Sequence, residues 1–261
     1  KGISVNFLDY LADIKGTSIY YIDSISFLGK FGLGIKHFNY GKINSYDILG
    51  NFLGKFNGNE FELVFSKSRQ IGQFIYGSNI KYIYSKIENY KNNAIFFDLG
   101  GTFFPTLNDQ FSIGINIKNF GFLFSEYKNQ KNSILPFDVQ IGTTIKPEYM
   151  PLRFSITIFN LYNSFENNVT FKDKSIIKKM LSRINLGTEV LVNNNINLQF
   201  GYNYLKRKEL NFEGLKGGGG FSYGFLLKIK RICINYARSI YNISGGSNSV
   251  SLSLNLKKII N

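Results

Sequence analysis

The sequence predicts an all-β chain that forms a transmembrane antiparallel β-barrel of about 14 strands. Two observations predict this fold. Apolar residues alternate with small or polar ones along most of the chain, as in residues 111–118, where every odd position is apolar. The segments that connect these stretches are short and long in turn. Because successive side chains of a strand point to opposite faces, a period of two gives each strand one apolar and one polar side.

The alternating stretches predict strands close to the roughly 10 residues of a tilted membrane-spanning strand. In chain order they are expected at 2–10, 16–26, 30–40, 58–69, 73–87, 94–103, 110–119, 136–146, 152–160, 183–192, 196–206, 217–229, 231–239 and 248–258. Glycine often falls on the polar face, where it permits the bends of a closing barrel. These glycines include Gly32, Gly34, Gly114, Gly142, Gly187, Gly201 and Gly224.

The connections separate into two series. Short ones are expected at 27–29, 70–72, 104–109, 147–151, 193–195 and Lys230; longer ones at 41–57, 120–135, 161–182, 207–216 and 240–247, with 11–15 and 88–93 the shortest of that series. Outer-membrane barrels have short periplasmic turns and longer extracellular loops. This parity predicts that both chain ends are periplasmic.

A membrane barrel turns its apolar faces outward, whereas a soluble barrel turns them inward. We therefore predict one set of residues facing lipid and one facing the lumen. The first set is Ile113, Ile115, Val139, Ile141, Phe225, Leu252 and Leu254, and the second is Ser112, Asn116, Gln140, Ser222 and Ser253.

Composition bounds the chain further. No linker or shift in composition divides the 261 residues, so residues 1–261 are predicted to form a single domain. The formal charge of +14 comes from scattered Lys and Arg rather than from a basic helix or nucleic-acid motif. We therefore expect no nucleic-acid partner. The basic groups near strand ends are placed to meet lipid phosphates or acidic glycolipid.

The sequence offers little for catalysis, cofactor binding or metal binding. Cys233 is the only cysteine, which excludes an internal disulfide and a Cys-rich zinc site. His37 is the only histidine and falls on the apolar face. Gly217 to Gly220 resemble a phosphate loop but lead into a predicted strand rather than a helix. We predict no catalytic residue, no cofactor and no metal.

Charged residues on the polar faces are the main site candidates. The acids are Asp98, Asp138 and Glu189, and the bases are Lys118, Arg153 and Arg183. Paired carboxylates could serve a glycosidase as acid and base. Ion pairing is the favoured interpretation, because an unpaired charge in a narrow lumen is costly. Asp138 and Arg153, on adjacent predicted strands, are expected within reach of one another.

One long connection carries a predicted helix. Asp173 is placed to cap residues 174–181, whose apolar side chains are spaced for one helix face. They are Ile176, Ile177, Met180 and Leu181. This face could cap the barrel mouth or dock a partner, and the sequence does not choose between them.

Several strings add a family resemblance. They are Gly2 to Tyr10, Leu135 to Gly142, Asn185 to Val190, Leu198 to Leu210, Gly217 to Phe225, Asn235 to Arg238 and Ser244 to Asn248. Together they resemble the PorV/PorQ family, above all its PorQ-like members, over most of the chain. The Asn-Asn-Pro-rich segment that precedes the barrel in that family is absent before Lys1, through trimming or natural reduction.

The resemblance implies a FadL-like outer-membrane barrel of the type IX secretion system. It implies a non-enzymatic role in attaching secreted cargo to lipopolysaccharide, with a PorZ-like partner and PorU and PorV-like proteins in the same complex. Two alternatives remain: a FadL-like transporter of hydrophobic solutes or a porin, and a soluble all-β binding protein. Fold alone does not choose between these functions.

Overall fold

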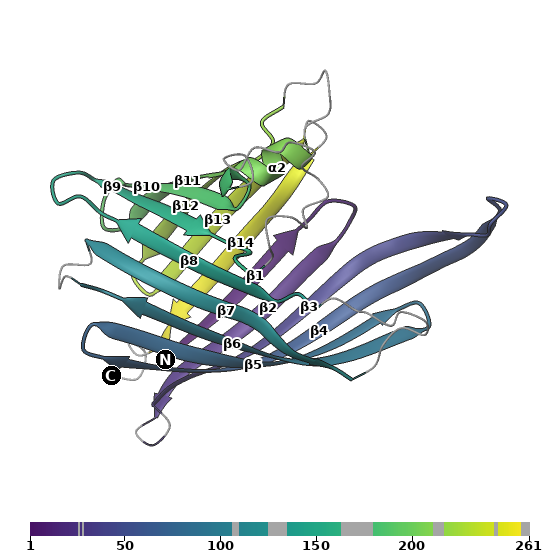
Figure 1. The fold of residues 1–261 in the computed structure, drawn as a ribbon, viewed down its shortest axis with the longest axis horizontal. Coiled ribbons are helices and arrows are strands. Elements are labelled where there is room, and N and C mark those ends of the chain that lie inside the picture. The colour runs from purple at the N-terminus through teal and green to yellow at the C-terminus, as the bar shows by residue number, and fades with distance from the viewer. Residues whose placement is uncertain are drawn as a thin grey trace.

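The computed structural model describes residues 1–25, 27, 29–105, 110–124, 135–162, 180–210, 217–242 and 245–256. These residues form a closed antiparallel barrel of 14 strands, in which each strand pairs with its neighbours in the chain (Figure 1). The first strand pairs with the last, with Ile3 opposite Leu254 and Phe7 opposite Val250. The predicted fold is confirmed.

The strands are β1 (Gly2–Asp9), β2 (Lys15–Ile25), β3 (Gly29–Tyr46), β4 (Phe52–Ile71), β5 (Phe74–Ile87), β6 (Tyr90–Phe103), β7 (Phe111–Leu123), β8 (Asp138–Ile145), β9 (Leu152–Ile158), β10 (Ile184–Leu191), β11 (Ile196–Asn203), β12 (Phe221–Ile229), β13 (Ile232–Asn242) and β14 (Gly245–Asn255). A short helix, α2 (Tyr204–Glu209), follows β11. β1 begins and β14 ends at the same end of the barrel, where Gly2 lies opposite Asn255 (Figure 1). Among the described residues, no helix has the length and apolarity needed to span a bilayer.

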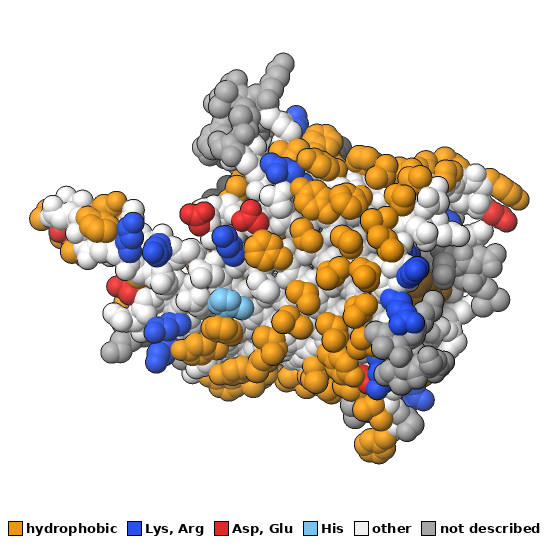
Figure 2. All heavy atoms as spheres, turned by 180° about the vertical axis from the view of Figure 1, so that it is seen from behind, with side chains coloured by type: hydrophobic (Ala, Val, Ile, Leu, Met, Phe, Trp, Pro, Cys, Tyr) orange, Lys and Arg blue, Asp and Glu red, His pale blue; other side chains and the backbone are white. Residues whose placement is uncertain are grey.

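The outer face of the barrel is apolar. Ile113, Ile115, Ile141, Phe225 and Leu252 are all exposed, as predicted for residues that face lipid. Figure 2 shows such side chains spread over one face of the barrel wall. Buried apolar side chains in the described part of the chain are Val64, Ala94, Phe96 and Tyr241. A barrel of this size with so few buried apolar groups is stable only with its outer face in lipid, which excludes the soluble barrel.

The prediction of a loop at 41–57 is wrong, because most of these residues belong to β3 and β4. β3 and β4 continue past the barrel rim as a projecting hairpin that turns at residues 47–51 (Figure 1). Ile43 lies opposite Phe56, and Tyr46 packs edge-on against Phe52 with ring centroids 5.8 Å apart. Gly41 has a φ of +71° beside a register shift, so the alternation breaks there although pairing resumes.

Other connections are shorter than predicted. β13 runs to Asn242 and β14 begins at Gly245, so most of the expected loop at 240–247 is strand. A register shift after Ile240 interrupts the alternation there. Likewise β6 begins at Tyr90, inside the expected connection at 88–93.

The predicted strands at 196–206 and 217–229 are each too long at the end near α2. Asn203 ends β11 because its side chain accepts a hydrogen bond from Lys206 N at 2.7 Å and caps α2. Arg207 donates to the carbonyls of Gly217 and Gly219 at 3.2 and 3.4 Å. With Gly220 at a φ of +85°, this segment turns before β12 begins at Phe221.

Candidate functional site

The lumen wall formed by β4 to β9 carries small and polar side chains. In one row Gly77 lies opposite Gly100, Gly100 opposite Asn116, and Asn116 opposite Gln140. The next row runs through Thr102, Gly114, Gly142 and Thr157. Because glycine has no side chain, the wall recedes along these rows.

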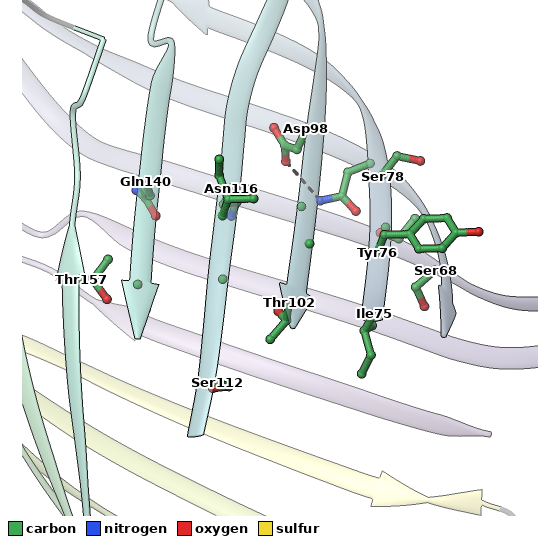
Figure 3. A pocket seen from close by; sticks show the side chains of 18 of the residues that line it. Ser68, Ile75, Tyr76, Ser78, Asp98, Thr102, Ser112, Asn116, Gln140 and Thr157 are labelled. Atoms are coloured by element: carbon green, nitrogen blue, oxygen red, sulfur yellow. Dashed lines mark hydrogen bonds between the residues drawn. The ribbon is translucent and has the colours of Figure 1, made fainter. Parts of the chain in front are cut away.

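The receding wall leaves a cavity of about 550 Å3 (Figure 3). Its polar lining includes Ser68, Asn79, Thr102, Ser112, Asn116, Gln140, Thr144 and Thr157. Ser112, Asn116 and Gln140 were predicted to face the lumen, and the cavity confirms it. The volume lies within the roughly 300–1,000 Å3 of small-molecule pockets.

Two further spaces lie along the same interior. One of about 370 Å3 shares Gln140 and Thr157 with the first and extends to Asn203, which caps α2, and to Lys206 within α2. The other, of about 560 Å3, lies at the rim of the β8–β9, β10–β11 and β12–β13 turns, and Arg153 and Asn197 help to line it. Together the three spaces extend along the barrel interior from the end near α2 toward the opposite rim, and polar side chains help to line each of them.

Arg153 and Glu189, two of the predicted site residues, form an ion pair in the lumen. Arg153 Nη1 lies 2.5 Å from Glu189 Oε2, and the two residues are register partners on β9 and β10. Glu189 Oε1 accepts hydrogen bonds from Asn197 at 3.0 Å and Gln199 at 3.3 Å. Both carboxylate oxygens are thus engaged.

Asp98 pairs with Lys81, a cation that sequence reasoning missed. Lys81 Nζ lies 2.6 Å from Asp98 Oδ1, which also accepts from Asn119 N at 2.9 Å. Asn79 Nδ2 donates to Asp98 Oδ2 at 3.1 Å, and Lys81 also bonds Asn119 Oδ1. Asn119 has a φ of +57° beside the register shift after Phe97, so a bulge aims its N–H at the carboxylate. The available signal was that Lys81 shares the polar face with Asn79.

Asp138 does not meet Arg153, and that prediction is wrong. Ile141 pairs with Ile158 and Ile145 with Phe154, so the antiparallel register puts Asp138 and Arg153 at opposite ends of the β8–β9 pair. Asp138 instead accepts from Gln140 Nε2 at 2.5 Å and from Asn160 N at 2.7 Å. Its register partner on β7 is Lys118.

Another ion pair lies on the wall between β3 and β4. Lys36 Nζ lies 2.9 Å from Glu62 Oε1, and these residues are also register partners. Arg183, the last predicted cation, is buried just before β10, where its carbonyl accepts from Phe159 N at 3.0 Å. In each of the three ion pairs, the positive charge of Lys36, Lys81 or Arg153 is neutralised by a carboxylate on a neighbouring strand.

The remaining candidates add no reactive centre. His37 lies on the outer face, where its ring stacks on Phe61 with centroids 4.4 Å apart and its Nε2 lies 3.2 Å from Asn59 Oδ1 (Figure 2). Cys233 is the register partner of Ser253 on the lumen side. Within the described part of the chain, no three His, Cys, Asp or Glu side chains gather to hold a metal.

The predicted loop helix falls mostly outside the described residues. Ile176 and Ile177 lie outside them, whereas Met180 and Leu181 are exposed where the described chain resumes.

No protein-family model matches the sequence, and no curated protein matches it. Solved structures do resemble the fold. The Pseudomonas putida toluene transporter TodX aligns with a TM-score of 0.54 at 11% identity, over 97% of this chain and 88% of that chain. The CymD monoaromatic hydrocarbon channel gives 0.52 at 9% identity, over 97% and 86%. The Ralstonia pickettii toluene transporter TbuX gives 0.50 at 10% identity, over 97% and 87%.

The chain shares the fold of these barrels. The predicted FadL-like architecture is confirmed, and the similar structures are channels and transporters rather than enzymes. At such low identity the likeness concerns the fold alone. The PorV/PorQ resemblance stays a prediction.

Proposed function

We propose that this protein is an outer-membrane channel for small water-soluble solutes. The observation that carries the proposal is the polar lumen, in which a cavity of about 550 Å3 adjoins one of about 370 Å3 through Gln140 and Thr157. The shared fold with TodX and CymD supports passage across a membrane. In this proposal the role is non-enzymatic and the chain ends lie in the periplasm.

The chemistry of the wall favours water-soluble solutes over hydrocarbons. A hydrocarbon in this cavity would cover amide and hydroxyl groups without offering them hydrogen bonds, which costs free energy. A polar solute instead exchanges its bound water for contacts with Thr102, Asn116 and Thr157, which line the cavity. The lumen therefore suits a porin better than a transporter of hydrophobic solutes.

Conductance tests the proposal directly. We expect the purified chain, inserted into a planar lipid bilayer in potassium chloride, to give discrete current steps. The same protein in liposomes should admit small sugars faster than empty liposomes do. Stable insertion, shown by heat-modifiable migration on a gel, without current or solute entry would overturn the channel.

We also propose a second function, as a docking component of the type IX secretion system that helps to anchor cargo to lipopolysaccharide. The sequence resemblance supports it, and so does the β3–β4 hairpin. Ile48 is 103% exposed and Leu49 82% at its tip, with Leu53 close by at 66%. Such a cluster of exposed apolar groups often marks an interaction site. The expected partners are a PorZ-like protein with PorU and PorV-like proteins.

The hairpin tip allows the two functions to be separated. Replacing Ile48 and Leu49 by serine should leave channel conductance unchanged, because the tip lies away from the lumen (Figure 1). If the chain docks a PorZ-like protein, the same double variant should lose retention of that protein in envelope pull-downs. A matched change on the barrel wall, Ile35→Ser, should keep it. Full retention by the tip variant would count against docking through this hairpin.

A further inference from the structure

The cavity between β4 and β9 offers hydrogen-bonding groups that are not used within the protein. Thr102, Asn116 and Thr157 line it from β6, β7 and β9. Their side chains make no hydrogen bond to any residue that the structure describes. Figure 3 shows Thr102, Asn116 and Thr157 along the cavity wall. A solute inside therefore meets free hydroxyl and amide groups on three strands.

These groups both donate and accept hydrogen bonds. A threonine hydroxyl has one donor and two acceptor lone pairs, and an asparagine amide has two donors and a carbonyl acceptor. Gln140, directly opposite Asn116, is held through its amide nitrogen by Asp138, and its carbonyl oxygen makes no hydrogen bond to another described residue. A ligand that matches such a wall carries several groups that also donate and accept. Alcohol hydroxyls have this property.

The wall presents little net charge to a solute. Asp98 lines the cavity, but Lys81 neutralises it at 2.6 Å and Asn79 and Asn119 occupy its oxygens. Lys67 belongs to the outward register, opposite Phe31. An anionic or cationic solute would therefore lose hydration without gaining a counter-charge. Neutral solutes avoid this cost.

The cavity also has room for a solute larger than water. At Gly100 and Gly114 an added Cβ would make only ordinary van der Waals contacts, at 3.6 Å or more, so neither position is closed by a neighbouring atom. The volume of about 550 Å3 is ample for one small organic molecule.

We infer that this cavity binds neutral polyhydroxylated solutes, the class of mono- and disaccharides. The inference rests on the proposed channel and names its solute class. A sugar offers a hydroxyl on most of its carbons, which meets the donor and acceptor pattern at Thr102, Asn116 and Thr157. Toluene would leave these groups unpaired, and gluconate would bring an uncompensated charge.

Binding is tested apart from conduction. Equilibrium dialysis of the detergent-purified chain with radiolabelled glucose and maltose should give saturable binding, whereas gluconate and toluene should bind more weakly. The double variant Asn116→Leu with Thr157→Val should bind the sugars about tenfold more weakly, since it removes two hydrogen-bonding groups. Ser251→Val, on the lumen side of β14 but outside the cavity lining, should bind them as the wild type does. Heat-modifiable migration on a gel checks folding, and Thr102→Val replaces the double variant if that one does not fold.

The outcomes separate this inference from the channel. Sugar binding that is weaker in the cavity variants supports the inference, whether or not bilayers show current. If such binding is found without current, only the proposed channel function is overturned. Current without saturable sugar binding overturns the inference and leaves the channel standing. Equal binding of glucose, gluconate and toluene, or binding unchanged in the cavity variants, also overturns it.

Discussion

Arg153 and Glu189 face each other across the β9–β10 ladder, with Nη1 and Oε2 2.5 Å apart on the lumen side of the wall. Two amides, from Asn197 and Gln199, complete the shell around the carboxylate. The pair joins two strands that are connected through a long segment of the chain, residues 159–183. The ion pair therefore adds a side-chain contact between two neighbouring strands that are far apart in sequence.

We expect removal of one partner of this pair to destabilise the barrel. Arg153→Met leaves the Glu189 carboxylate without its cation, and the loss should be about 1–3 kcal/mol, below the value for fully buried pairs because the arginine side chain is 36% exposed. Denaturant unfolding in detergent measures it. Thr188→Val, on the outer face of β10, serves as the control. The double variant Arg153→Met with Glu189→Gln should recover part of the loss, and an unchanged midpoint in Arg153→Met would contradict the pairing.

Two adjacent residues of β14 should differ in how well they tolerate a new charge. Leu252 is 48% exposed on the outer face, whereas Ser253 faces the lumen and donates a hydrogen bond to Ser4 at 3.0 Å. Leu252→Arg should cost about 2–4 kcal/mol because it buries a charge in lipid. Ser253→Arg can reach water in the lumen and should cost less. Refolding yield into lipid vesicles compares the two, and equal yields would be inconsistent with a lipid-facing Leu252.

Two neighbouring glycines on β6 test the lumen as the path of conduction. Gly100 faces inward, and Gly101 lies in the outward register opposite Ile115. Neither position blocks a new Cβ, because the nearest atoms lie at 3.6 Å and 3.9 Å. Gly100→Phe should fill the cavity and lower single-channel conductance several-fold, while Gly101→Phe should place its ring in lipid and leave the conductance near the wild-type value. Equal conductance in both variants would place the path elsewhere.

The hairpin tip should lose its order in acid. The Asn51 side chain, together with the backbone N–H groups of Asn51 and Leu49, donates hydrogen bonds to Asp47 and lowers the pKa of that carboxyl. A pKa lower in the folded state means that the ionised form supports the turn. This support is fully present above the ordinary pKa of an aspartate and is lost as the pH falls through the lowered value.

Amide hydrogen exchange at Leu49 and Asn51, whose N–H groups donate to the Asp47 carboxylate, would show the loss when followed between pH 6 and pH 2 and corrected for intrinsic rates. Asp47→Asn should remove most of this pH dependence, since the amide does not titrate in that range. Protection that stays constant in the wild type through the acid range would contradict a role for the carboxylate.

The sequence by itself determined which face of a strand is which. In residues 111–118 the alternation predicts Ile113 and Ile115 outside and Ser112 and Asn116 inside, and the structure agrees. The reason is local, because the two-residue period of a strand follows from its own backbone geometry. The strand number and the antiparallel order followed from repeating this pattern along the chain.

Only the tertiary structure decided which charges meet. Asp138 and Arg153 lie on adjacent strands, yet the register separates them and gives Arg153 to Glu189. Asp98 reaches Lys81 rather than a predicted cation because the β5–β6 register sets Asp98 opposite Asn79, two positions from Lys81. A bulge in β7 brings the N–H of Asn119 to the same carboxylate. Register and bulges depend on hydrogen bonds between distant segments, and a pattern that reads neighbours along the chain does not contain them. For the same reason the alternation is interrupted at Gly41. The hairpin beyond it depends on the pairing of β3 with β4, as at Ile43 and Phe56, which the alternation does not predict.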